Sequence, residues 1–386
     1  MNIQGQKIDS IDVEKIVSSI FKNSQHKKRV QSIANAALGI ITSASLIIHR
    51  IGRGLAKAMN LSDKHAIKQV DRLLSNKKFD SENSQENFLH YVIGGRKEIK
   101  ITMDWTDFDK DDHATLSLNL VTNHGRATPI LWKTFSKNKL KNNRNKYEDE
   151  VLLRLRQFVP TDVKVTILAD RGFCDIKLFD FLKNDLGFDY IIRIRSNILV
   201  ETNTGERKLS AEFISNSGRS KTFRDIKITH DKYLVNTFVC IKAPKMKQAW
   251  CIVSSDKELV GSNIVKWYAK RWGCEPQFRD TKDIYLGMGL SKTSIKDEKR
   301  RDRILFIHAI ATVVLTLLGA AGEKIGLDRY LKANTAKTRT MSLFSQGCIY
   351  FSRVPKMVES TLQSLLNEFY LLIEENKNLV EILGVI

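Results

Sequence analysis

Four residues near the middle of the chain, Tyr268, Arg271, Glu275 and Lys282, have the types and the spacing for chemistry on phosphate groups. At about 100° per residue they fall at about 0°, 300°, 340° and 320° around an α-helix, within an arc of roughly 60°. A carboxylate on such a face can hold a divalent metal ion while the cations hold the phosphates on which the metal acts. A solvent-exposed, salt-bridged helix face would show the same pattern, so the spacing leaves both interpretations open.

The predicted helix has two weak points close to the glutamate. Gly273 lowers its helix propensity, and Pro276 lacks a backbone donor and clashes with the carbonyl group of Trp272. We therefore expect the helix to be kinked there, or to begin one turn later than the spacing suggests.

Two upstream aspartates end segments that have the pattern of β-strands. Residues 99–103 form a short β-type run before Asp104, and residues 163–169 alternate and then run apolar before Asp170. Acids at the ends of central strands can line a site, although a lone aspartate there is more often a loop or capping residue. The end of a sheet can direct only one side chain of an acidic run into a site. We interpret the acids that follow Asp104 as turn or solvent residues: Asp107, Asp109, Asp111 and Asp112.

The phrases around these residues resemble those of a known family. Tyr-x-x-Arg-x-x-x-Glu-x-x-x-x-x-x-Lys at 268–282 is followed by Gly-Met-Gly-Leu at 287–290, Asp104 opens Asp-Trp-Thr, and Asp170 opens Asp-Arg-Gly-Phe. In this order they are similar to the signatures of bacterial insertion-sequence transposases of the DDE class, in particular the cut-and-paste members. The acids are 66 and 105 residues apart, and the long second gap is typical of members with a β-rich insertion.

The resemblance implies a fold and a reaction. The fold class would be α/β, an RNase H-like mixed sheet flanked by helices, with a β-rich insertion subdomain and helical N- and C-terminal regions. Asp104, Asp170 and Glu275 would be the catalytic residues and would hold two Mg²⁺ ions, for which Mn²⁺ can substitute. The enzyme would cleave DNA at the ends of its own element and join the 3′-OH ends to target DNA by two-metal phosphoryl transfer.

The resemblance also implies DNA contacts and partners. Tyr268, Arg271 and Lys282 would bind phosphates near the cleaved end, and Trp250 would stack on a base flipped out in a hairpin intermediate. The partners would be double-stranded DNA, both the terminal inverted repeats and the target, and a second copy of the chain in a homodimeric DNA complex.

The composition agrees with a nucleic-acid partner. The chain has 63 basic and 43 acidic residues, a net charge of +20, which is of the sign and size that bind polyphosphate. Five cysteines without a C-x-x-C pair indicate neither a disulfide framework nor a zinc site, and we expect a reducing bacterial cytoplasm, at the nucleoid. The apolar runs 33–48 and 304–322 could suggest membrane spans, but the first is short, and the second matches a buried helix of the family.

The chain divides into five predicted regions. They are a helical DNA end-binding domain (1–95), the first part of an RNase H-like catalytic core (96–196), a β-rich insertion subdomain (197–262), the second part of the core with the glutamate helix (263–325), and a C-terminal helical region that is a candidate for dimerisation (326–386), with a tail helix over 356–382. Within the first part of the core the pattern predicts strands at 99–105, 114–121, 127–134, 163–169 and 188–195 and helices at 146–158 and 175–184.

A basic stripe marks the predicted end-binding domain. Lys64, Lys68 and Arg72 recur every four residues, opposite an apolar stripe. An ordinary amphipathic surface helix would have the same pattern. The phrase Ile-Lys-Gln-Val-Asp-Arg-Leu-Leu-Ser at 67–75 is similar to one in the end-binding domain of the family, and it favours a DNA contact by these three residues.

The sequence thus predicts a DDE transposase. One alternative is an RNase H-like, metal-dependent nuclease without strand transfer. The other is a catalytically decayed DNA-binding protein, against which the three intact acids argue. The sequence leaves open the terminal repeats, the target-site preference, the activity of the element in its host and the oligomeric state without DNA.

Overall fold

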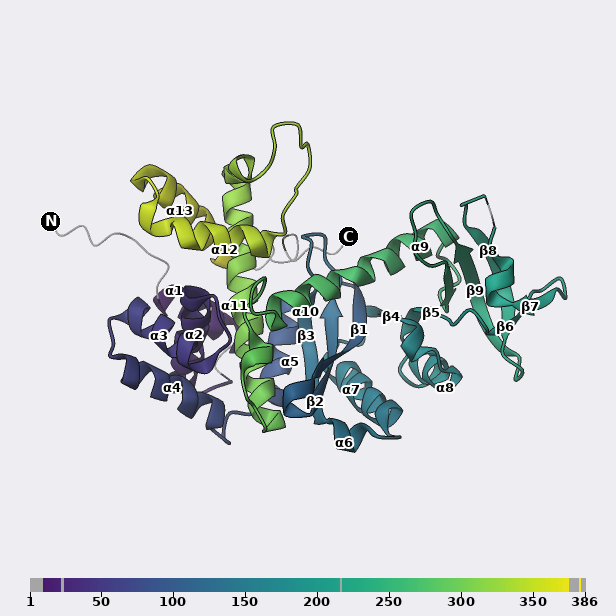
Figure 1. Ribbon diagram of the computed structural model, residues 1–386, viewed down its shortest axis with the longest axis horizontal. Coiled ribbons are helices and arrows are strands. Elements are labelled where there is room, and N and C mark those ends of the chain that lie inside the picture. Colours follow the sequence, from purple (N-terminus) through teal and green to yellow (C-terminus); the bar gives the residue numbers. More distant parts are fainter. Residues whose placement is uncertain (1–9, 22–23, 216, 375–381, 383–386) are drawn as a thin grey trace.

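The computed structural model describes residues 10–21, 24–215, 217–374 and 382. Within these residues ten strands form one sheet in the order β3-β2-β1-β4-β5-β10-β9-β8-β6-β7 (Figure 1). The strands are β1 (Glu98–Phe108), β2 (His113–Leu120), β3 (Thr128–Ser136), β4 (Lys164–Ala169), β5 (Asp189–Arg193), β6 (Leu199–Glu201), β7 (Arg207–Leu209), β8 (Lys221–Ile228), β9 (Tyr233–Ile241) and β10 (Trp250–Ser254).

The first five strands form the core of the fold. β1 pairs with β4 and β4 with β5 in parallel, whereas β2 and β3 are antiparallel to their neighbours. α6 (Lys137–Leu140) and α7 (Arg144–Phe158) connect β3 to β4, and α8 (Ile176–Asp180) with one π-helical turn (Phe181–Asp185) connects β4 to β5. This mixed sheet with helical crossovers is the RNase H-like fold, so the predicted fold class is confirmed. The predicted strands and helices of this part are present, with ends that differ by up to three residues.

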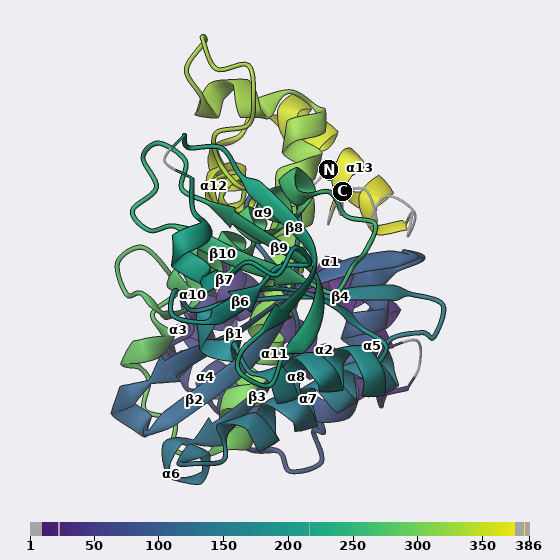
Figure 2. The ribbon, with the colours of Figure 1, turned by 90° about the vertical axis from the view of Figure 1, so that its right-hand side faces the viewer.

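The region predicted as an insertion is rich in β-structure, and its strands extend the core sheet. β10 pairs antiparallel with β5, and β9 and β8 follow it outward. Figure 2 looks onto this end of the molecule, with β6 to β9 in front of the core. The chain therefore leaves the core after β5 and returns beside the same strand.

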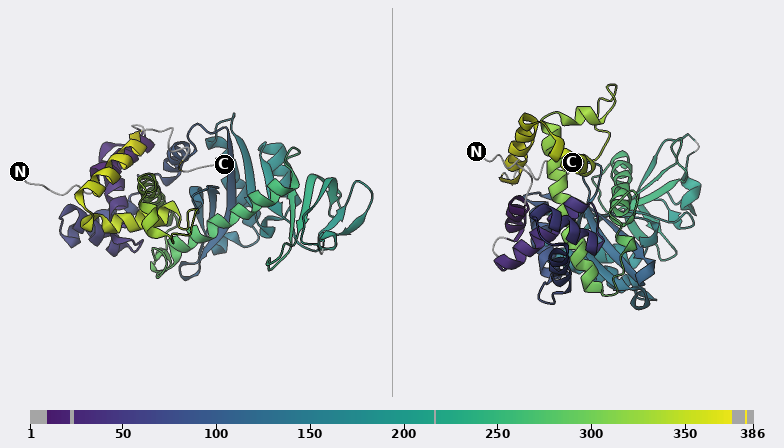
Figure 3. Two further views of the ribbon diagram at one scale, coloured as in Figure 1. Left: turned by 90° about the horizontal axis from the view of Figure 1, so that it is seen from above. Right: turned by 60° about the vertical axis from the view of Figure 1, so that its left-hand side comes forward.

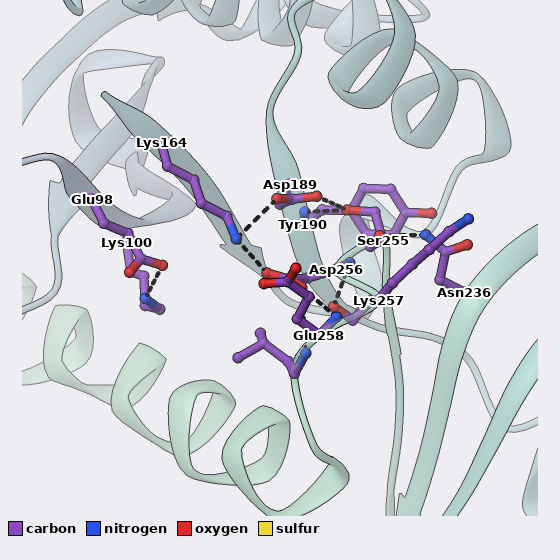
Figure 4. A network of polar contacts seen from close by, with 12 residues as sticks. Glu98, Lys100, Lys164, Asp189, Tyr190, Asn236, Ser255, Asp256, Lys257 and Glu258 are labelled. Atoms are coloured by element: carbon purple, nitrogen blue, oxygen red, sulfur yellow. Dashed lines mark hydrogen bonds and ion pairs between the residues drawn. The ribbon is translucent and has the colours of Figure 1, made fainter. Parts of the chain in front are cut away.

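A network of polar side chains fixes this return (Figure 4). Lys164 Nζ donates to Asp256 Oδ2 at 2.7 Å and forms an ion pair with Asp189 at 3.7 Å. Ser255 Oγ donates to Asp189 Oδ1 at 2.8 Å and accepts the N–H of Tyr190 at 3.0 Å. Lys164 begins β4 and Asp189 begins β5, so the network lies at the sheet edge opposite the one at which β4 ends.

Helices form the two terminal regions and cover the sheet (Figures 1 and 3). The N-terminal ones are α1 (Ser10–Phe21), α2 (Lys27–Ser43), α3 (Ile48–Met59), α4 (Asp63–Ser75) and α5 (Ser81–Ile93). The later ones are α9 (Gly261–Lys270), α10 (Cys274–Lys282), α11 (Glu298–Lys324), α12 (Leu343–Arg353) and α13 (Glu359–Glu374). The predicted tail helix over 356–382 is thus α13 where it is described, and residues 375–381 lie outside the described residues.

α11 is the central element of the helical part. It packs against α2, α5, α12, α13 and β3, so it joins the N-terminal helices, the sheet and the C-terminal helices. Two glycines allow its close approach to α12: a Cβ atom on Gly347 would lie 1.8 Å from the carbonyl oxygen of Leu315, and one on Gly319 would lie 1.9 Å from that of Leu343. α11 is long and apolar enough to cross a membrane, but 94% of its apolar window is buried inside the protein, as in a core helix.

The other apolar run is not one helix. α2 ends at Ser43 and α3 begins at Ile48, and the two helices are bent by 96° at the break.

The burial of α11 can be tested with Val314, which lies in its covered part. Val314→Asp would bury an unpaired carboxylate, and we expect the free energy of unfolding to fall by about 3 kcal/mol or more. Lys299→Asp, at an exposed position near the start of the same helix, should change it by less than about 1 kcal/mol. Chemical unfolding of the detergent-free proteins measures both. Recovery of the wild type from the membrane fraction alone would contradict a core position of α11.

Candidate active site

The sheet places two of the predicted acids next to each other. β1 and β4 run in parallel with Met103 opposite Ala169, so Asp104 and Asp170 are the next residues on the two strands. β4 ends there, and Asp170 caps a short 3-10 turn: its Oδ1 accepts the N–H of Gly172 at 2.7 Å. A Cβ atom on Gly172 would lie 2.9 Å from that oxygen, so the glycine lets the carboxylate fold back over the turn.

The segment that carries the four spaced residues is broken into two α-helices. α9 ends at Lys270, a 3-10 turn covers Arg271–Gly273, and α10 begins at Cys274. The predicted single helical face is therefore wrong, whereas the expected late start of the glutamate helix is confirmed. Pro276 is the third residue of α10, where a backbone N–H has no partner within the helix, so its missing donor costs little. The carbonyl group of Gly273, in the break, accepts the N–H of Ala127 at 3.1 Å.

Arg271 lies between the carboxylates that the two segments bring together. Its Nη1 is 3.5 Å from Asp104 Oδ2, and its Nη2 is 3.4 Å from Glu275 Oε1. The guanidinium group is buried, and Asp170 is close enough to interact with it electrostatically. The broken helix thus directs Arg271 toward the acids, where it compensates part of their negative charge.

Asp104 is the carboxylate with the most perturbed environment of the three. The pKa of Asp104 is raised to about 6. Burial is the largest cause; the charge of Arg271 acts to lower the pKa, the charge of Asp170 to raise it, and the hydrogen bond from the Cys274 thiol to lower it. The Cys274 Sγ lies 3.5 Å from Asp104 Oδ2 and donates to it. No sequence pattern points to Cys274, because its contact depends on the position of α10 against β1. The charged form of Asp104 is therefore costly mainly because the carboxylate is withdrawn from water.

The other residues expected to bind DNA near the site lie in different environments. Lys282, at the end of α10, donates to the carbonyl group of Asp107 at 2.6 Å and to Thr106 Oγ1 at 3.2 Å, so it ties the helix to β1. Tyr268 is buried, and its ring packs edge to face against the half-buried Trp250, with the ring centres 5.0 Å apart. Tyr268 and Trp250 thus lie against each other, and Tyr268 precedes Arg271 by three residues in the sequence.

The acids that follow Asp104 are not all turn or solvent residues. Asp109 is exposed and pairs with Lys137, as expected. Asp111 contradicts the prediction: it is buried and forms an ion pair with the fully buried Arg301 of α11. The guanidinium group of Arg301 also lies 4.0 Å from the ring centre of Phe108. This pair anchors the β1–β2 turn to α11, a contact that needs a partner 190 residues away in the sequence.

A basic cleft of about 600 Å³ lies between α2 and α4, in the N-terminal helices. Of the three lysine and arginine residues predicted there, Lys68 and Arg72 line the cleft, and Lys64 is exposed on α4 but does not. The start of α2 adds His26, Lys28 and Arg29 from the basic run at 26–29, whose position beside α4 no pattern along a single helix could reveal. None of the described residues that line the cleft is acidic: they are His26, Lys28, Arg29, Ser32, His65, Lys68, Gln69, Arg72, Leu73 and Asn76.

The three acids fit a divalent metal in their chemistry. Carboxylate oxygens are the ligands that Mg²⁺ and Mn²⁺ prefer, and burial makes the charged form of Asp104 costly, a cost that a bound cation would offset. In the described part of the chain, however, no three His, Cys, Asp or Glu side chains are close enough as they stand to bind one ion. Here Arg271 stands between Asp104 and Glu275, so all three acids could share a metal only after its side chain turned away.

Comparison with known families agrees with this fold and site. The model of the transposase DDE domain family matches residues 95–314, from the start of β1 into α11, and the chain belongs to this family. A comparison with curated proteins finds no match. The family makes the chain a DDE transposase, an enzyme class that acts on nucleic acid and generally uses divalent metal ions.

The electrostatics of Asp104 give a testable effect on stability. Because its pKa is raised in the folded state, the folded protein binds this proton more tightly than the unfolded chain does. Its ionisation therefore costs stability as the pH rises from about 4 to about 6. We expect Asp104→Asn to raise the free energy of unfolding at pH 8 by up to about 3 kcal/mol, and to have much less effect near pH 4.

Thermal or urea unfolding of the wild type and of Asp104→Asn across this pH range measures the difference in their free energies of unfolding. This difference reports on Asp104 alone, because the other carboxylates are the same in both proteins. If Asp104→Asn instead lowered the stability at pH 8, Asp104 would be a structural partner of Arg271 and Cys274.

Proposed function

We propose that this DDE transposase cuts DNA at the ends of its own insertion element and joins the freed 3′-hydroxyl ends to target DNA. Asp104, Asp170 and Glu275 are the residues that would hold the metal, as two Mg²⁺ ions or Mn²⁺. The bound metal would supply Lewis-acid activation of the attacking oxygen and stabilisation of the leaving oxygen. The attacking group is first water and then the 3′-hydroxyl, so no covalent bond to the protein forms.

One observation carries this proposal. Two acids 66 residues apart lie side by side at the end of parallel strands, and a third, 105 residues further on, is bridged to the first by one arginine. A structural role would leave such carboxylates paired one to one with cations. Here Asp104 and Glu275 share the single guanidinium group of Arg271, and Asp170 interacts with it only at longer range, which favours a site that takes up additional positive charge when it works.

The cations and aromatic rings around the acids would handle the DNA. In this proposal Arg271 leaves the carboxylates and binds a phosphate beside the cleaved bond. Lys282 holds the end of the glutamate helix against β1 and contacts the DNA backbone nearby. Trp250, half-buried against Tyr268, would stack on a flipped base in a hairpin intermediate. Two copies of the chain would act together on paired ends, with the C-terminal helices as the candidate dimer contact.

The basic cleft between α2 and α4 would bind the element end. Its cations come from two helices, so they can follow a curved phosphate backbone better than one stripe on α4 could. Residues 1–95 would therefore serve as the end-binding domain, with Lys68 and Arg72 as its main contacts, and Lys64 at the margin of the bound DNA.

The cleft predicts a salt-dependent loss of binding. Lys68→Gln with Arg72→Gln should weaken binding to an end-containing duplex, and should lower the slope of log Kd against log salt concentration by about 2, because two phosphate contacts are lost. Lys146→Gln with Lys356→Gln removes the same charge from exposed positions outside the cleft and should leave the slope nearly unchanged. Fluorescence anisotropy at several salt concentrations measures both. Equal slopes for the two double variants would remove the cleft from the DNA interface.

The acids predict a separation of binding from chemistry. Asp104→Asn, Asp170→Asn and Glu275→Gln should each abolish nicking of a duplex that carries the inverted repeats flanking the gene, while end binding persists, because binding comes mainly from cations elsewhere. Mn²⁺ should replace Mg²⁺, and Ca²⁺ should support binding without turnover.

Nicked, hairpin and joined products are separated on denaturing gels, with wild-type protein and Mg²⁺ as the reference. Near-wild-type nicking by one variant would show that its residue is not a metal ligand. Nicking without joined products in the wild type would make the protein a nuclease instead of a transposase.

A further inference from the structure

The loop after the glutamate helix exposes two large apolar side chains. Tyr285 is 91% exposed, the highest value for a large apolar residue in the described chain, and Leu286 is 70% exposed. Single exposed apolar residues are common on protein surfaces and need no function. Here two exposed apolar residues are adjacent, and the backbone of their loop is fixed by several hydrogen bonds.

Backbone contacts fix the loop from both sides. Asp283 Oδ1 accepts the N–H groups of Tyr285 and Leu286 at 2.7 Å and 2.6 Å. The Met288 N–H donates to the carbonyl group of Asp280 at 2.7 Å, and the Met288 carbonyl accepts the N–H of Leu46 at 2.7 Å. The loop is thus tied both to α10 and to the α2–α3 turn of the N-terminal helices.

A glycine makes this close packing possible. A Cβ atom on Gly287 would lie 2.3 Å from the carbonyl oxygen of Arg279 and 2.5 Å from that of Asp280. The backbone that carries the two apolar side chains is therefore pre-formed. A loop whose backbone is already ordered loses less conformational entropy when its side chains enter a partner.

The surroundings of the loop favour a partner that combines negative charge with stacked apolar surfaces. Arg279 and Lys292 are exposed, and both lie near enough to Asp283 to lower the pKa of its carboxyl group, although its hydrogen bonds from Leu286 and Tyr285 are the larger cause. Lys282 adds a third cation at the start of the loop. A protein partner would favour an apolar surface around the two side chains, whereas DNA offers phosphates to the cations and base faces to the Tyr285 ring and the Leu286 side chain.

The position of the loop relates it to the acids. Lys282 is the seventh residue after Glu275, which corresponds to a helical rise of roughly 10 Å. The tip of the loop, at Tyr285 and Leu286, therefore lies about 10–15 Å from the acids. At about 3.4 Å for each base-pair step, this corresponds to roughly three or four base pairs of duplex.

We propose that Tyr285 and Leu286 form a wedge that enters the base stack of the bound DNA a few base pairs from the phosphate that the acids attack. The wedge separates one base step, bends the duplex there, and thereby presents the cleaved strand to Asp104, Asp170 and Glu275. This inference rests on the proposed DNA cleavage, and it adds a deformation of the substrate that the acids alone do not provide.

The experiment uses the full chain, with Ca²⁺ in place of Mg²⁺, and an end-containing duplex. 2-Aminopurine is placed in turn at each position within about six base pairs of the nick, twice the estimated reach of the loop. Its fluorescence rises when its base is unstacked. We expect a several-fold rise at one or two adjacent positions with the wild type, and loss of most of that rise with Tyr285→Ala and Leu286→Ala combined.

Controls separate the wedge from general effects of the substitutions. Tyr330→Ala with Leu234→Ala changes a tyrosine and a leucine in other parts of the chain, which are 80% and 58% exposed. This double variant should keep the full rise in fluorescence. The Tyr285 and Leu286 variant should also nick slowly on the paired duplex and recover on a duplex with a mismatch at the unstacked step. A variant that had lost its fold would nick neither duplex at the wild-type rate. In that case the milder pair Tyr285→Phe with Leu286→Met should keep the rise in fluorescence.

The possible failures are distinguishable. If the wild type binds and nicks the duplex without any rise in fluorescence, or if the double variant gives the same rise, the wedge is wrong and the proposed function stands. If the variant keeps the rise but loses dimers in light scattering of the DNA complex, the loop contacts a second copy of the chain, and the wedge is wrong. If the wild type neither binds nor nicks the end-containing duplex, the proposed function fails and the wedge with it.

Discussion

The burial of one carboxylate beside two other acids is the constraint on which the candidate site depends. Asp104 of β1 lies near Asp170 at the end of β4 and the exposed Glu275 of α10, and burial makes the negative charge of Asp104 more costly than in water. The protein compensates this charge with one guanidinium group, 3.4–3.5 Å from two of the acids, and with a proton on Asp104 up to about pH 6. In the proposed function a bound cation would take the place of this guanidinium group and of this proton. The cost of burying the charge of Asp104 would then favour the binding of the metal.

The rest of the sheet explains how the third acid reaches the other two. The chain leaves the core after β5 and builds four further strands, which would carry it away from the site. β10 then pairs with β5, and the contacts among Lys164, Asp189 and Asp256 hold that pairing at the far edge of the sheet. α9 starts from there and runs back across the sheet toward β1 (Figure 1). The position of Glu275 is therefore set by the junction between the insertion and the core, and changes in that junction would move the glutamate without touching it.

Local pattern was sufficient for the strands, because alternation and apolar runs are properties of short segments. That Asp104 and Asp170 lie on neighbouring parallel strands is a long-range property, which only the resemblance to the family implied, and their role in catalysis stays a prediction. The glutamate helix was predicted less well. Angular spacing assumes one continuous helix, and the break at Arg271–Gly273 depends on a hydrogen bond from Ala127 to Gly273, in a loop far away in the sequence. The burial of Tyr268 against Trp250 and of Asp111 against Arg301 likewise requires partners that no local pattern identifies. Lys68 and Arg72 of the basic stripe on α4 line a cleft whose second side comes from α2, and their contact with DNA stays a prediction.

The distribution of charge separates holding DNA from cutting it. A net charge of +20 favours association with DNA, but in the proposed function the acids would repel the phosphate that they have to reach. A solution is to bind the duplex firmly at a distance from the acids, through the cleft between α2 and α4, and to bring the reactive phosphate in only when positive charge accompanies it. Arg271 lies where it could control this step. While its side chain faces the carboxylates it lowers their repulsion, and once it faced a phosphate the carboxylates would be free to bind the metal. Substrate and metal would then each favour the binding of the other, because both stabilise the arrangement in which Arg271 has turned away.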